Sequence, residues 1–123
     1  MIKGTGIDII QVDRIAKSLQ KPGFKNHVFT KNEQDYCDST SSKWESYAGK
    51  FTAKESFLKA LGIGVLDGLP LNFIEVLVKD SGQPFFNLHP LVINMFPFLS
   101  KCQFHLSISH TKENAIAYVI IEE

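Results

Sequence analysis

The chain has 123 residues, of which 44% are hydrophobic and 21% charged, and its 13 basic side chains balance its 13 acidic ones. That length suits one domain with its own core, and the composition is that of a soluble globular protein. Zero net charge gives no reason to expect nucleic-acid binding, so an anion site must come from local clustering. We therefore predict a single domain over residues 1–123.

The sequence favours a cytoplasmic location. Cys37 and Cys102 stand apart with no C-x-x-C spacing, which is typical of reduced thiols and not of a disulfide framework or a zinc site. The first residues lack the long apolar stretch of a signal peptide, and no apolar run approaches the roughly 20 residues that span a bilayer. We expect no membrane segment.

One strand and several helices are predicted in the first half. Residues 4–12 are rich in β-branched side chains, which favours a strand, and Asp13 is placed to cap a short helix after it. The capping-box pattern, a Ser or Thr with Glu three residues later, occurs at Thr30 and again at Ser42. The first predicts a short helix, and the second predicts the longest helix, which Gly62 ends.

The second half predicts mainly strands. Four strand-like runs cover residues 72–79, 83–88, 103–109 and 115–121. Asp80-Ser81-Gly82 is a turn sequence between the first two, while residues 90–97 suit either a short helix or a plain connection. One strand, then helices, then several strands indicates an α+β fold in which helices pack on a largely antiparallel sheet.

Charged residues interrupt core-forming segments at two points. Asp8 lies inside Gly6-Ile7-Asp8-Ile9-Ile10, and Glu55 and Lys59 lie four apart on the predicted long helix. Spacing alone favours an outward-facing Asp8 and a surface Glu55–Lys59 pair worth about 0.2–0.5 kcal/mol. The alternative is a shared site, because a partly buried carboxylate needs a partner or a metal ion. Two carboxylates that leave positions open for phosphate oxygens suit Mg²⁺.

Two further polar clusters have a structural and a functional interpretation. The long helix also carries Lys43, Lys50 and Lys54, which form either a solvated lysine face or a polyanion site. His110, at the end of Ser107-Ile108-Ser109-His110-Thr111, is either a structural residue at a strand end or a donor to a phosphate. A Ser-His-Asp hydrolase is not supported, since there is no G-x-S-x-G elbow.

Three motifs, in order over nearly the whole chain, resemble those of the small holo-acyl-carrier-protein synthases of the 4′-phosphopantetheinyl transferase superfamily. They are Gly6-Ile7-Asp8-Ile9-Ile10…Asp13-Arg14-Ile15, residues 48–62, and Ser107-Ile108-Ser109-His110-Thr111. Gly82-Gln83-Pro84 also matches a turn of that family. The resemblance implies the family's α+β fold and its reaction. In that reaction the phosphopantetheine arm of coenzyme A moves to a serine of apo-acyl carrier protein, adenosine 3′,5′-bisphosphate is released, and fatty acid biosynthesis is served.

The resemblance also implies roles by position. Asp8 and Glu55 become Mg²⁺ ligands, and Asp8, Glu55 and Lys59 become the catalytic residues, with Lys59 facing the pyrophosphate and Glu55 the hypothetical base. Lys50 stands where many members have Arg, so the bidentate fork is lost. Thr52 replaces a usual Ala, a small change from which we expect no effect on the chemistry. The implied coenzyme A contacts are Lys50, Lys54, Lys59, Gly62, His110 and Thr111.

Partners follow from the same resemblance. Acyl carrier proteins are acidic, and Arg14, in a basic first helix, is the expected contact. Family members are typically homotrimers with sites between subunits, and the apolar strand over residues 115–121 could serve that assembly. Two alternatives stay open. One is another coenzyme A or nucleotide phosphotransferase that uses the same carboxylates, and the other is a non-catalytic module that binds carrier protein or nucleotide.

Overall fold

The computed structural model describes residues 1–64 and 69–123. Within these residues the elements follow the predicted order, in which one strand precedes a block of helices and four strands come after that block. The elements are β1 (Ile2–Gln11), α1 (Val12–Ser18), α2 (Phe24–Val28), α3 (Lys31–Ser39), α4 (Lys43–Leu61), β2 (Ile74–Val78), β3 (Pro84–Leu88), α5 (Pro90–Met95), β4 (Gln103–His110) and β5 (Asn114–Glu122), with short 3-10 turns at Leu71–Phe73 and Pro97–Lys101. None of the described helices is long and apolar enough to cross a membrane.

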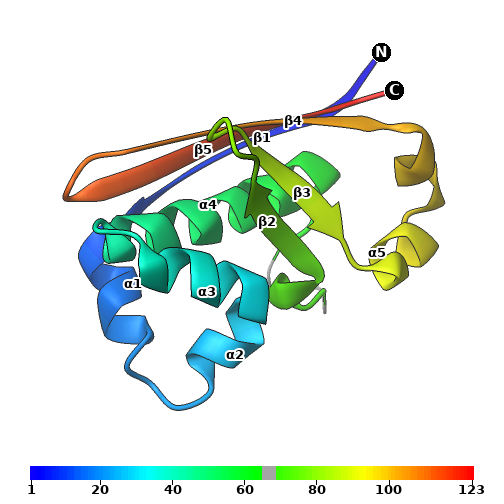
Figure 1. Cartoon of the computed structure of the whole chain (residues 1–123). Helices are drawn as coiled ribbons and strands as arrows, with labels where there is room; N and C mark the ends of the chain where they lie inside the picture. Colours follow the sequence, from blue (N-terminus) through cyan, green and yellow to red (C-terminus); the bar gives the residue numbers. More distant parts are fainter. Residues whose placement is uncertain (65–68) are drawn as a thin grey trace.

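Two antiparallel sheets flank the long helix α4. The larger sheet has the strand order β1-β5-β4, and β2 and β3 form a separate hairpin. In Figure 1 the larger sheet covers one side of α4, whereas α1, α2 and α3 lie on the other side, and the two termini meet at one end of the sheet. This arrangement confirms the α+β prediction of helices packed on a largely antiparallel sheet.

Close contact between β1 and α4 depends on glycine. Residues of β1 alternate between the helix side and the outer side of the sheet, and Gly4 and Gly6 lie on the helix side. A Cβ at Gly6 would overlap the backbone carbonyl of Ser56, and one at Gly4 would overlap that of Ala60. Asp8 follows two residues later and therefore also faces α4, so the outward orientation that its spacing allowed is not the one adopted.

The helix ends test the predicted caps. At Thr30 the capping box forms, since Glu33 N donates to Thr30 Oγ1 at 3.3 Å and Thr30 N donates to Glu33 Oε1 at 2.8 Å. Ser42 is the N-cap of α4, as predicted for the start of the longest helix, but its side chain makes no capping hydrogen bond, so the predicted capping box does not form there. Asp13 lies in the first turn of α1 and not at its N-cap, which is a second correction. Gly62 ends α4 as predicted, in the left-handed region with φ 79°.

Candidate active site

One cavity holds both predicted metal ligands. It has a volume of about 390 Å³ and lies between β1, α1 and α4, with Asp8 and Glu55 in its wall. Arg14 of α1 lines the same cavity, together with Phe24 and Phe51. We call it the carboxylate cavity. It brings together Asp8 and Arg14 of the first motif and Glu55 of the central motif.

Both carboxylate oxygens of Asp8 have partners. Thr52 Oγ1 donates to Oδ2 at 2.7 Å, and Lys59 Nζ lies 3.2 Å from Oδ1. Lys59 also donates to the carbonyl of Ile7 at 3.0 Å. The ion pair of Lys59 is therefore with Asp8, and not with Glu55 as its helical spacing suggested. Thr52, Glu55 and Lys59 follow i, i+3, i+7 spacing, so one face of α4 carries all three toward β1.

Both burial and the charge of Asp8 affect the pKa of Glu55. Burial, and after it the negative charge of Asp8, raise the pKa of Glu55, and Lys59 opposes the change. Two carboxylates that repel each other in one cavity fit a bound divalent cation, which would relieve the repulsion. No group of three or more His, Cys, Asp or Glu side chains gathers within residues 1–64 and 69–123. A site of two protein carboxylates suits Mg²⁺, which keeps several positions for water and substrate phosphate oxygens.

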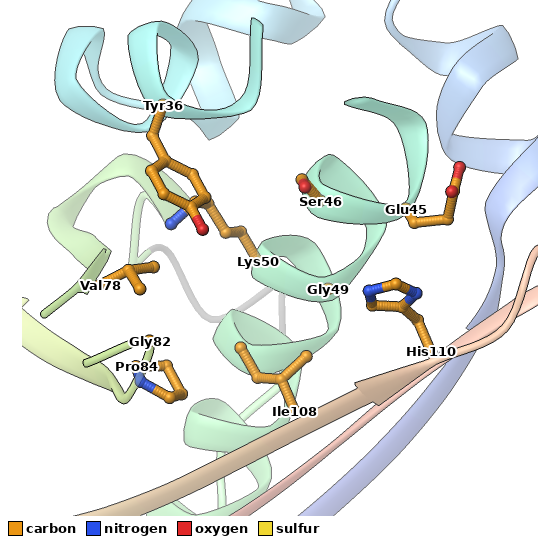
Figure 2. A pocket seen from close by; sticks show the side chains of 10 residues that line it. All are labelled: Tyr36, Glu45, Ser46, Gly49, Lys50, Val78, Gly82, Pro84, Ile108 and His110. Atoms are coloured by element: carbon orange, nitrogen blue, oxygen red, sulfur yellow. The ribbon is translucent and has the colours of Figure 1, made fainter. Parts of the chain in front are cut away.

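A second cavity, of about 180 Å³, surrounds the Lys50 side chain and is called the lysine cavity (Figure 2). Lys50 comes from α4, Tyr36 from α3, Gly82 and Pro84 from the hairpin, and His110 from the end of β4. The structure thus joins two of the predicted coenzyme A contacts, Lys50 and His110, with the turn that the family resemblance singled out. Among the described residues, none lines both this cavity and the carboxylate cavity.

Lys50 is a buried cation with few partners. Only 3% of the residue is exposed, and its Nζ donates to the carbonyl of Val76 at 2.6 Å. The same nitrogen lies 4.6 Å from the centre of the Tyr36 ring, a cation–π contact. Burial lowers the pKa of Lys50. Since an ammonium group has three protons, the Val76 bond leaves donor capacity for an anion in the cavity.

Lys54 is placed differently from what the resemblance implied. Its side chain is fully buried and lines neither cavity. Nζ donates to Glu33 Oε1 at 2.9 Å, to the Leu71 carbonyl at 3.0 Å and to the Ile74 carbonyl at 2.8 Å. All three ammonium protons are therefore used inside the protein. These contacts join α3, α4 and the hairpin, and they do not support the expectation that Lys54 contacts coenzyme A.

Two other predicted coenzyme A contacts, Gly62 and Thr111, lie just beyond the ends of a helix and a strand. Gly62 is the exposed C-cap of α4 and lines neither cavity, so its described role is to end the helix. Thr111 follows His110 in the turn between β4 and β5, where its hydroxyl accepts from Glu113 N at 3.2 Å and Asn114 N at 3.1 Å. Thr111 shapes the turn that presents His110.

Sequence reasoning missed two residues of the site. Thr52 was expected to be inert, yet it contacts Asp8. Tyr36 was not among the predicted site residues, yet its ring lies over the Lys50 ammonium group. A helical projection of residues 50–59 was the available signal for Thr52, since it places this residue beside Glu55 and Lys59. No sequence signal pointed to Tyr36.

Known proteins agree with this geometry. Residues 4–119 match the ACPS family model, described as the 4′-phosphopantetheinyl transferase superfamily. A holo-[acyl-carrier-protein] synthase of Cytophaga hutchinsonii is 38% identical, over 100% of this chain and 99% of that protein. The chain belongs to the 4′-phosphopantetheinyl transferase superfamily.

Solved structures show which group within the superfamily the chain resembles. The holo-[acyl-carrier-protein] synthase of Neisseria meningitidis aligns with a TM-score of 0.87 and 27% identity over 100% of both chains. That of Bacillus anthracis, solved in complex with CoA (3′,5′-ADP), aligns with a TM-score of 0.81 and 38% identity, over 99% of this chain and 97% of that one. Within the superfamily the chain falls among the holo-[acyl-carrier-protein] synthases, and it is a transferase.

Proposed function

We propose that this chain transfers the 4′-phosphopantetheine arm of coenzyme A to a serine of apo-acyl carrier protein and releases adenosine 3′,5′-bisphosphate. This is the reaction of its family, and it serves fatty acid biosynthesis. The observation that carries the proposal is the meeting of Asp8, Glu55 and Lys59 in one site. A carboxylate pair beside an ammonium group suits a pyrophosphate bound with a divalent cation.

Asp8 and Glu55 would hold the magnesium ion. Their mutual repulsion, relieved by a cation, supports this assignment. When bound, the ion would neutralise charge on the pyrophosphate oxygens and on the leaving nucleotide phosphate. The remaining work of the protein is to position the reactants and to stabilise charge, as in other phosphoryl transfers.

Lys59 and Glu55 have separate tasks in the proposed reaction. The side chain of Lys59 is 54% exposed, so its ammonium group is free to reach from Asp8 to a phosphate oxygen. Glu55 accepts the proton of the attacking serine, directly or through a water molecule. The position of Glu55 in the wall of the carboxylate cavity supports this choice.

The lysine cavity would take the nucleotide end of coenzyme A. Lys50 supplies a buried positive charge, and His110 lies at the same cavity with Thr111 beside it. We therefore keep Lys50, Lys59, His110 and Thr111 as proposed coenzyme A contacts and leave out Lys54 and Gly62.

The outer face of the larger sheet supports a homotrimer. Ile7 and Ile9 are 55% and 64% exposed, and they pair in register with the exposed Tyr118 and Ile116. These four side chains form a continuous apolar stripe, which a second copy of the chain would cover. Since family members typically have their sites between subunits, we propose that the lysine cavity of one protomer and the carboxylate cavity of its neighbour together form the complete site.

Arg14 and the free cysteines bear on the partner and the location. Arg14 lines the carboxylate cavity, so it is placed to bind the acidic carrier protein as its serine enters. Cys37 and Cys102 are free thiols, which supports a reducing cytoplasm as the working compartment.

Mass spectrometry of apo-acyl carrier protein incubated with coenzyme A and Mg²⁺ tests the proposed reaction. A mass gain equal to phosphopantetheine, abolished by a chelator, is expected. Glu55→Gln should lose both the mass gain and metal affinity, while Asp35→Asn, an exposed acid on α3, is the matched control. A carrier protein that is bound without any mass gain would instead support the non-catalytic module.

The docking role of Arg14 has its own measurement. Arg14→Glu should raise the KM for carrier protein far more than the KM for coenzyme A, because the proposed contact of Arg14 is with the acidic carrier protein. Equal effects on both KM values would contradict docking at this position.

A further inference from the structure

Thr52 lies beside the proposed metal site without being a proposed ligand. The residue is fully buried in α4, and its hydroxyl donates to Asp8 Oδ2 at 2.7 Å. Lys59 binds the other oxygen of the same carboxylate at 3.2 Å. The Asp8 carboxylate is thus held from both sides, by one neutral donor and one charged donor.

The two donors differ in how firmly they hold Asp8. Lys59 has a long side chain that is 54% exposed, and the proposed reaction requires it to turn toward phosphate. Thr52 is β-branched and enclosed by packing, so its hydroxyl has few orientations. Close approach of β1 at Gly6 fixes the spacing between strand and helix across which this hydrogen bond forms.

We propose that Thr52 is a positioning residue for Asp8, whose hydroxyl fixes the carboxylate in the orientation that binds the divalent cation. The inference rests on the proposed function, in which Asp8 is a metal ligand. Hydrogen-bond partners of metal-binding side chains typically change metal affinity by about 10–100-fold.

Calorimetric titration of Mn²⁺ into the full-length enzyme with coenzyme A, without carrier protein, tests the inference with no dependence on turnover. Thr52→Val, which keeps the volume and removes the hydroxyl, should bind Mn²⁺ about 10-fold more weakly. Thr52→Ser, which keeps the hydroxyl, should stay within about twofold of the original protein. Wild-type affinity in Thr52→Val would overturn the proposal.

Two further variants separate the possible causes. Thr52→Ala should match Thr52→Val; if it binds like the original protein, a methyl clash in the valine variant explains the loss and the proposal fails. Asp8→Asn reports on the metal site itself, and unchanged Mn²⁺ binding there would overturn both the metal assignment and this inference. Loss in Asp8→Asn with no loss in either Thr52→Val or Thr52→Ala would overturn the inference alone.

Discussion

Replacing Lys54 by Met tests whether this lysine of the central motif is structural. Its ammonium group donates to Glu33 at 2.9 Å and to the carbonyls of Leu71 and Ile74 at 3.0 and 2.8 Å, and both members of the ion pair are fully buried. Met fills much of the same space but carries no charge and no donor. The substitution therefore leaves the Glu33 carboxylate buried without a counter-ion.

The expected loss of unfolding free energy follows from these contacts. Removing one partner of a buried ion pair costs about 3–5 kcal/mol. Glu33 keeps hydrogen bonds from Thr30 N and Val76 N, each at 2.8 Å, which lessen the loss. The Ile74 carbonyl loses its Lys54 donor and increases the loss, at about 1–3 kcal/mol when buried, whereas the Leu71 carbonyl still accepts from Ile74 N. We expect a net loss of about 3–5 kcal/mol, since these contributions oppose each other and do not add independently.

Urea unfolding followed by circular dichroism, at one fixed protein concentration, measures this change. Lys31→Met is the matched control, because Lys31 and Asp35 are only 2.6 Å apart but 84% and 61% exposed. Water already screens that pair, so no measurable change is expected. Glu33→Gln combined with Lys54→Met should lose less stability than the two single changes together, because the pair is coupled.

An unfolding curve for Lys54→Met that overlays the original one would refute this reasoning. If the same variant also bound adenosine 3′,5′-bisphosphate more weakly, the coenzyme A role expected from the sequence would be restored. Loss of stability with unchanged nucleotide affinity in the folded fraction would confirm the structural role.

Calorimetry with adenosine 3′,5′-bisphosphate should show binding that weakens as the pH rises through the pKa of Lys50, which burial holds below the usual 10.5, because only the ammonium form attracts the anion. Lys50→Arg stays charged and should remove that pH dependence; an identical profile would exclude Lys50 from the site. Tyr36→Leu should lower the free energy of unfolding by about 1 kcal/mol and Tyr36→Phe should not, because the cation–π contact with Lys50 forms without nucleotide and needs only the ring. Equal effects would contradict this contact. Gly6→Ala should lower Tm, since its Cβ meets the Ser56 carbonyl, and an unchanged Tm would contradict the close packing of β1 on α4.

Local patterns predicted structure where one short-range interaction decides the outcome. Thr30 forms its capping box because its backbone is extended, with φ −72° and ψ 166°. Ser42 has the same sequence pattern, but its φ of −105° and ψ of 56° do not form the cap. The conformation in which the chain enters α4 therefore overrides the pattern at Ser42, and sequence alone does not reveal that conformation.

The spacing of residues in the sequence could not predict which distant side chains meet in the fold. Asp8 meets Glu55 only because β1 lies against α4 with its even-numbered residues inward, and the pairing was expected from the family resemblance and not from periodicity. The sequence could, however, have predicted that the charged residues of α4 lie on two different sides of the helix. At about 100° per residue, Glu55 and Lys59 lie on one side of the helix while Lys50 and Lys54 lie on the opposite side. Treating these lysines as one charged face missed that Lys54 lies on the side of α4 away from Glu55 and Lys59.

Because α4 carries both residues that stabilise the fold and residues proposed for the chemistry, loss of activity cannot by itself assign a residue of this motif. Lys54→Met would lower activity by reducing the folded fraction, yet its folded molecules would keep Asp8, Glu55 and Lys59 in place. Lys59→Met would leave the core intact and remove a charge beside Asp8. Activity per folded molecule, measured over a range of temperatures below unfolding, should therefore be near normal for Lys54→Met and low throughout for Lys59→Met.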